Sequence, residues 1–235
     1  MGAADRFEFP GIALIDTALN TGCATLLDAL SLAVAYPTEA LVEAWRNGEF
    51  TEILDAALAQ AQADASVRQA GADLAAGIQT YFSHDRQTED VQADYVGLFE
   101  LNREQPPVYL LQHLYPRETH TTQIELYKAL LERYRRCGIT MKQGEGALPP
   151  DQLSVQLEFV AYLFGALNQA HARPEDNDVA LRRAVLADTV RMLQWIDAPI
   201  ERLAQTGIQH PLYVPLLRLV RHALDLCATN TGNDD

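Results

Sequence analysis

Residues 150–171 form the segment that most restricts how this chain can fold. Large apolar side chains recur there at the three- and four-residue spacing of one helical stripe, namely Leu153, Leu157, Val160, Phe164 and Leu167. Three more widen that stripe: Phe159, Tyr162 and Leu163. A helix that is apolar over most of its circumference is stable only when other helices surround it. The segment therefore predicts the central helix of a bundle.

Helical spacing continues along the rest of the chain, and almost nothing alternates with the period of two expected of strands. Further helices are predicted over 16–35, 37–48, 50–63, 66–82, 87–101, 119–137, 178–204 and 211–227. Pro37 and Gly48 supply stop signals, Ser66 is a candidate N-cap, and Gly138 follows Arg135 and Arg136 as a candidate C-terminal stop. Long irregular stretches are expected only at 102–118 and 138–149.

The chain has 235 residues, of which 48% are hydrophobic, so it can bury a substantial core and is not globally disordered. No repeat of fixed period and no sharp change of composition marks a domain boundary. We therefore predict an all-α fold, a single-domain helical bundle over residues 1–235, with a frayed polar tail at 228–235.

The net charge of the chain limits the kinds of partner that it can bind. Lysine and arginine number 18 against 32 aspartates and glutamates, which gives a formal net charge of −14. Nucleic acids and anionic membranes need a basic surface, so neither is expected as the main partner. The balance favours a basic partner instead.

The start of the chain does not read as a targeting signal. Asp5 and Glu8 stand where a secretory leader has basic residues, and Asp16, Asn20 and Asp28 interrupt the apolar stretch that follows. We expect a cytoplasmic protein with no stable membrane insertion.

Catalytic and metal-binding patterns are missing from the sequence. The six histidines form no H-E-x-x-H motif, no G-x-S-x-G elbow is present, and no glycine-rich loop opens a helix. Cys23, Cys137 and Cys227 are odd in number and lack C-x-x-C spacing, as expected of reduced thiols. We expect no catalytic residue, no metal site and no cofactor, and hence a protein that is not an enzyme.

Five short motifs give the chain a family resemblance. In order they are Tyr95-x-x-Leu98-Phe99, Pro106-Pro107, Leu110-Leu111-Gln112-His113-Leu114, Tyr134-Arg135-Arg136-Cys137-Gly138-Ile139 and Pro150-Asp151-x-Leu153-x-x-x-Leu157-Glu158-Phe159-x-x-x-Leu163. Together they resemble the TorD/DmsD/NarJ family of molybdoenzyme assembly chaperones, and most closely its NarJ-like branch. The resemblance covers 87–171 and, more loosely, the rest of the chain to its end, whereas the first 86 residues match only in helical character.

The resemblance implies an all-helical chaperone without a cofactor of its own. Such a protein holds the N-terminal, twin-arginine-type leader of a molybdenum-containing catalytic subunit until the molybdenum cofactor is installed and the subunit is exported. A basic, partly apolar leader would lie as a helix in a groove between 87–101 and 150–171. The implied leader-binding residues are Tyr95, Leu98, Phe99, Pro107, His113, Tyr115, Asp151, Gln152, Leu153, Glu158 and Phe159.

The chain departs from the family pattern at two places. Gln152 stands where the family usually has histidine, so a role that needs a titrating imidazole at that position is in doubt. Ala147, Leu148 and Pro149 stand where the family often has an acidic residue. The site could therefore be built in the same way with weaker charge.

Several alternatives remain open. The spacing of Tyr95, Leu98 and Phe99 suits a core as well as a groove, Asp151 could simply satisfy amides in the first turn of its helix, and a buried Glu158 would need a partner. The client could be a membrane-bound nitrate reductase that is not exported. The protein could also be an unrelated helical adaptor or ligand-binding protein, and either a monomer or a homodimer.

Overall fold

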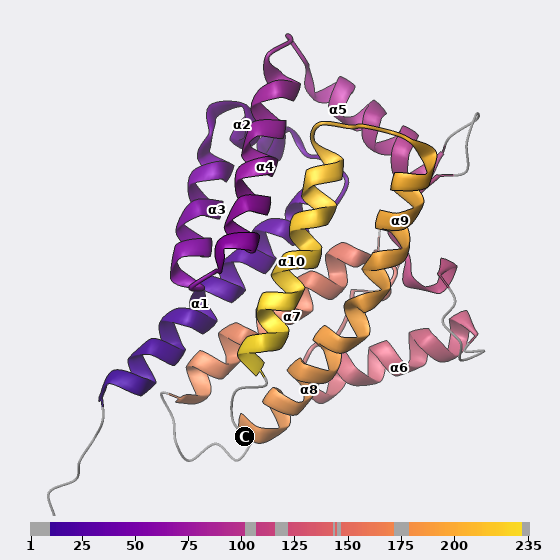
Figure 1. Cartoon of the computed structure of the whole chain (residues 1–235). Helices are drawn as coiled ribbons and strands as arrows, with labels where there is room; N and C mark the ends of the chain where they lie inside the picture. The colour runs from indigo at the N-terminus through magenta and orange to yellow at the C-terminus, as the bar shows by residue number, and fades with distance from the viewer. Residues whose placement is uncertain are drawn as a thin grey trace, which may run out of the picture.

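The computed structural model describes residues 10–101, 107–115, 122–142, 144, 147–171 and 179–231. In this part of the chain every regular element is helical, which confirms the all-α prediction (Figure 1). The α-helices are α1 Pro10–Ala33, α2 Glu39–Asn47, α3 Glu49–Gln60, α4 Ala65–Phe82, α5 Thr88–Tyr95, α6 Gln123–Arg136, α7 Leu153–His171, α8 Val179–Met192, α9 Asp197–Thr206 and α10 Tyr213–Thr231. Shorter turns complete them: a π-helical turn η1 at Val96–Glu100 and the 3₁₀ turns η2 at Gln112–Leu114 and η3 at Leu193–Ile196.

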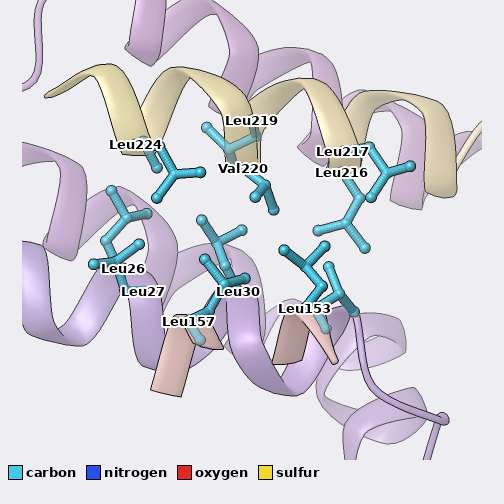
Figure 2. Close-up of a cluster of buried hydrophobic side chains, with 14 of the residues drawn as sticks. Leu26, Leu27, Leu30, Leu153, Leu157, Leu216, Leu217, Leu219, Val220 and Leu224 are labelled. Atoms are coloured by element: carbon cyan, nitrogen blue, oxygen red, sulfur yellow. The ribbon is translucent and has the colours of Figure 1, made fainter. Parts of the chain in front are cut away.

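The core lies where α7 packs along α1, with α10 laid over both. Figure 2 shows leucines of α10 facing Leu26 and Leu30 of α1 and, beyond them, Leu153 and Leu157 of α7. These four leucines are fully buried, and a buried leucine side chain contributes about 1.5–3 kcal/mol to stability. The central position predicted for 150–171 agrees with this packing. One side of α7 is uncovered, however, as the 41% exposure of Tyr162 shows.

Several helix boundaries differ from the sequence-based expectation. The N-cap of α4 is Asp64 and not Ser66, since Asp64 Oδ1 accepts hydrogen bonds from the backbone N–H groups of Ser66 and Val67. A carboxylate is as good a cap as a hydroxyl, so residue type alone did not decide between the two positions. The stops at Gly48 and Gly138 are confirmed, and both glycines have the left-handed backbone that favours their residue type (φ 88° and 79°).

The predicted helices at 87–101 and 178–204 are each interrupted. The first ends in the π-helical turn η1, where the Leu101 N–H donates to the Val96 carbonyl. The second is broken by η3, and α9 begins just before Pro199. Proline has no N–H to donate and is tolerated only in the first turn of a helix, so a continuous helix through this position is disfavoured.

The polar tail predicted at 228–235 is wrong for residues 228–231, which belong to α10. Thr229 donates its hydroxyl proton to the Asp225 carbonyl, and the Asn230 amide lies 3.6 Å from Cys23 Sγ on α1. These contacts hold the last turn of α10 in place. Residues 232–235 lie outside the described part of the chain.

Hydropathy along the described helices gives no membrane-crossing candidate: none of them is both long and apolar enough.

The close approach of α1 to the end of α3 gives a first prediction. A Cβ added to Gly22 would lie 2.2 Å from the Ala61 nitrogen and 2.6 Å from the Gln60 carbonyl carbon. Backbone atoms cannot move aside easily, so Gly22→Ala should cost about 1–3 kcal/mol and lower the melting temperature by several degrees. Gly165→Ala on α7 is the matched control, since a Cβ there meets nothing within 4 Å. An unchanged melting temperature for Gly22→Ala would contradict the observed packing.

Candidate functional site

Two segments far apart in the chain cross where α7 begins. The Leu153 N–H donates to the Leu110 carbonyl (3.0 Å), and the Gln112 N–H donates to the Asp151 carbonyl (3.1 Å). These bonds make an isolated antiparallel bridge between Leu111 and Gln152. We call residues 107–115 and 150–153 the crossing. It brings together two predicted site residues, His113 and Asp151, that are 38 positions apart in the sequence.

The carboxylate of Asp151 is the buried charge of the crossing. Its side chain is fully buried, and its Oδ2 accepts a hydrogen bond from the His113 backbone N–H (2.9 Å) and lies 2.7 Å from His113 Nδ1. An ionised Asp151 requires that Nδ1 carry a proton and donate it. A buried carboxylate is costly unless it is hydrogen-bonded, so these two bonds hold both segments together. The interpretation of Asp151 as a residue that satisfies its own helix is therefore not supported by these contacts.

Tyr127 of α6 closes one side of this pair. Its ring meets the His113 imidazole edge-on, with 6.0 Å between the ring centroids. Burial raises the pKa of Tyr127, and the Asp151 carboxylate adds to that shift. The phenol therefore stays neutral near neutral pH and can act as a hydrogen-bond donor.

A second polar residue, Gln156, lies buried one turn further along α7. Its Nε2 donates to the Gln112 side chain (2.9 Å) and to the Asp151 carbonyl (3.0 Å), and its Oε1 accepts from Trp195 Nε1 (3.3 Å). Tyr115 stacks on the same Trp195 at 5.9 Å. Sequence reasoning missed Gln156. The available signal was an amide on a helix that is otherwise apolar on that side.

The structure places three predicted groove residues in the core instead. Tyr95, Leu98 and Phe99 are only 3%, 7% and 3% exposed. The Phe99 ring packs against Tyr95 and Tyr213, with 5.1 Å between centroids in each case. In this structure they provide no open groove wall, and the core reading of their spacing is the one observed. Leu153 is also fully buried.

The remaining predicted residues lie nearer the surface. Pro107, His113, Tyr115 and Gln152 are half-buried at the crossing. Glu158 is exposed, so it needs no buried partner.

A groove of about 400 Å³ runs beside the crossing, between one side of α7 and the segment after α6. We call it the α6–α7 groove. Its described lining includes Tyr134, Ile139, Met141, Lys142, Leu148, Val155, Glu158, Phe159 and Tyr162. The floor is apolar, and Leu148 and Tyr162 stand at its rim with 49% and 41% of their surface exposed. Two predicted site residues therefore line this groove: Glu158, which is exposed, and Phe159, which is buried in its floor.

Hydrogen bonds fix the walls of the α6–α7 groove. The Tyr134 hydroxyl donates to the Pro150 carbonyl (2.7 Å), which ties α6 to the crossing. The Tyr162 hydroxyl donates to the Cys137 carbonyl (3.0 Å), which ties the end of α6 to α7. The Phe159 ring packs against the Tyr134 ring, with 4.6 Å between the ring centroids, and fills the space between α6 and α7. The groove is thus largely preformed, as small-ligand and peptide sites usually are.

Metal-ligating side chains do not gather at this site or elsewhere in the described residues, where no group of three or more His, Cys, Asp or Glu could hold an ion.

The His113 and Asp151 contact gives a second prediction. Asp151→Asn removes the charge from the hydrogen bonds at the crossing and should cost about 1.5–3 kcal/mol. His113→Ala should then cost much less in the Asn variant than in the native chain, with a coupling of at least about 1 kcal/mol in a double-mutant cycle. Urea unfolding of the native chain, the two single variants and the double variant measures this coupling. Asp55→Asn on the exposed side of α3 serves as the control. Strictly additive losses would show that the two side chains do not act together.

Comparison with known proteins shows that the part of the chain with the crossing and the α6–α7 groove matches a known family. A family model described as nitrate reductase delta subunit matches residues 60–201, which is 142 of the 235 residues. A comparison with curated proteins found no match. The matched range includes both segments of the crossing and all of the groove. The chain therefore belongs to the nitrate reductase delta subunit family, the NarJ-like family of molybdoenzyme assembly chaperones that its motifs resemble.

Proposed function

We propose that this chaperone binds the N-terminal leader of a molybdenum-containing catalytic subunit in the α6–α7 groove. It holds the subunit in the cytoplasm while the molybdenum cofactor is inserted and releases it before export. One observation carries the proposal: within the family-matched range, the open apolar groove lies directly beside the crossing and contains Glu158 and Phe159.

The groove suits an amphipathic helix. Val155 and Tyr162 lie two turns apart on α7 and offer partly exposed apolar surface to a partner helix, and the buried Phe159 fills the floor between them. Glu158 stands beside that surface and is exposed, so it can pair with a cationic residue of a leader. A leader that orders only on binding gives up part of its affinity, which leaves release possible.

The crossing supports this groove by fixing its walls. The Tyr134 bond to Pro150 fixes the start of α7 relative to α6, and the Asp151 bonds to His113 fix it relative to the segment 107–115. A leader can then meet walls that are already in place, which lowers the entropic cost of binding. In this role the protein binds and positions its client and catalyses nothing itself.

A second candidate client is a membrane-bound nitrate reductase that is not exported. The name of the matched family favours it, because that description refers to nitrate reductase. The same groove would then hold an N-terminal segment that is no longer an export signal. The two clients differ in whether their N-terminus carries a twin-arginine motif, and binding tests on both kinds of peptide separate them.

The third prediction tests the groove with such peptides. Leu148→Ser and Glu158→Gln change exposed residues and should leave the melting temperature within a degree or two. Leu148→Ser should weaken leader binding by about 5–30-fold, as loss of an interface anchor does. Glu158→Gln should reduce the salt dependence of binding, because it removes a screened charge pair. Fluorescence anisotropy with labelled leaders at low and high salt measures both effects.

Ile124→Ser is the matched control for this test. Ile124 lies on α6, is 67% exposed and does not line the groove. Its substitution should leave leader affinity unchanged. If no molybdoenzyme leader and no full-length catalytic subunit binds the native protein, the proposed function is wrong. If Ile124→Ser weakens binding as much as Leu148→Ser, the groove is not the binding site.

A further inference from the structure

A second groove, of about 430 Å³, lies between the C-terminal half of α1, α2 and the beginning of α3. We call it the α1–α3 groove. Its large apolar lining residues are Leu32, Tyr36, Leu41, Phe50 and Ile53. Its lining lies between positions 25 and 53, before position 60 where the family match begins. Membership of the family therefore says nothing about this groove.

The α1–α3 groove exposes apolar surface that the described residues leave uncovered. Leu32, Tyr36 and Ile53 are 57%, 47% and 42% exposed. Single exposed apolar residues are ordinary, but three around one groove form a patch of the kind that marks an interaction site.

Aromatic contacts hold the walls of this groove. Phe50 is buried beneath it and meets the Trp45 ring edge-on at 6.1 Å. Tyr36 meets Tyr95 of the core edge-on at 5.6 Å. The groove is preformed in the free chain, so a ligand does not have to open it.

The segment that forms the α1–α3 groove is strongly acidic. Residues 17–64 contain one base, Arg46, and seven acids, namely Asp28, Glu39, Glu43, Glu49, Glu52, Asp55 and Asp64. Arg46 is already paired with Glu43 (2.7 Å) and donates to the Arg86 carbonyl. Asp28 and Glu49 line the groove, are exposed, and form no ion pair within the described part of the chain. Their charges are available to a cationic partner.

The α6–α7 groove has a different charge. Lys142 and Glu158 balance there, and the three arginines in the last turn of the adjoining α6 are paired with Asp188 and Glu132. The two grooves are also well separated: Figure 1 shows α2 and α3 at the upper left and α6 at the lower right. One short helix cannot occupy both, and the larger surplus of acidic residues lies in the segment that forms the α1–α3 groove.

We propose that the α1–α3 groove is a second peptide-binding surface, which takes a short amphipathic helix with lysine or arginine on its polar face. The apolar side of that helix would cover Leu32, Tyr36 and Ile53, and its cations would meet Asp28 and Glu49. A second copy of this chain is disfavoured as the occupant, because two acidic rims would be brought together. The inference goes beyond the leader site, since it concerns other helices and other charges.

The test uses a fluorescently labelled peptide of about 14 residues, an amphipathic helix of leucine and lysine, with the full-length protein. A peptide of the same pattern with glutamate in place of lysine is the ligand control. The lysine peptide should bind and weaken as salt rises, and the glutamate peptide should not bind. Ile53→Lys should weaken binding of the lysine peptide by at least about tenfold, because it places a cation in the apolar lining of the groove.

Leu181→Lys makes the same change on α8, at a side chain that is 45% exposed and lines neither groove. It should leave affinity for the lysine peptide within about twofold of the native value. Asp28→Asn with Glu49→Gln should flatten the salt dependence. Leu32→Lys repeats the test if Ile53→Lys lowers the melting temperature.

Three results would overturn the proposal. The first is equal loss of binding in Ile53→Lys and Leu181→Lys, and the second is equal affinity for the glutamate peptide. The third is a dimer in sedimentation equilibrium that Ile53→Lys dissociates, because a second copy would then be the occupant. Each result is independent of leader binding at Leu148, so failure here leaves the proposed function to be judged by its own experiment.

Discussion

The packing of α7 against α1 is the interaction on which the rest of the structure depends. Fully buried leucines of both helices meet beneath α10, and no other pair of helices shares as long a contact within the described residues. The same helix carries the crossing at its first turn and the floor of the α6–α7 groove on its uncovered side. Core and candidate site are therefore two sides of one element, and loss of the core contact would also displace the groove.

The crossing shows how this chain fixes a short irregular segment to a helix. The segment at 107–115 buries Val108 and Leu110 in the core. Buried polar bonds add to this and fix its register: Asp151 to His113, and Gln156 to Gln112 and Trp195. Buried polar groups that find hydrogen-bond partners favour one arrangement over its alternatives. The resemblance raised doubt because Gln152 replaces a family histidine. An imidazole nevertheless lies at the crossing, because His113 reaches Asp151 from the opposite segment.

The fold was largely predictable from the sequence, because helical periodicity is local. The central helix at 150–171 could be identified since its apolar residues exceed what one face needs. The interruption of the predicted helix before Pro199 was less evident, because proline occurs in the first turn of a helix as well as just after the end of one. Burial of Tyr95, Leu98 and Phe99 could not be decided, since a core and a groove wall share one spacing.

The outlines of the two grooves could not be predicted from the sequence. The spacing of apolar residues indicates the apolar side of each helix, but which part of that side stays open depends on where the neighbouring helices end. Glu158 and Phe159 were identified through the family resemblance, whereas their groove partners Met141 and Leu148 lie in a stretch predicted only as irregular. The α1–α3 groove lies where the resemblance was weakest. Its acidic composition was visible in the sequence, but its exposed Leu32 and Ile53 look like ordinary core positions.

In the proposed complex the α6–α7 groove contacts the N-terminus of a molybdoenzyme catalytic subunit. Site-specific photo-crosslinking tests this contact, with a photoreactive amino acid at position 148 and the same residue at position 181 as the reference. Mapping by mass spectrometry should place crosslinks from position 148 in the N-terminal segment of the full-length catalytic subunit, with none from position 181. Crosslinks from position 148 that fall only in other parts of the subunit, or equal yields from both positions, would contradict the account.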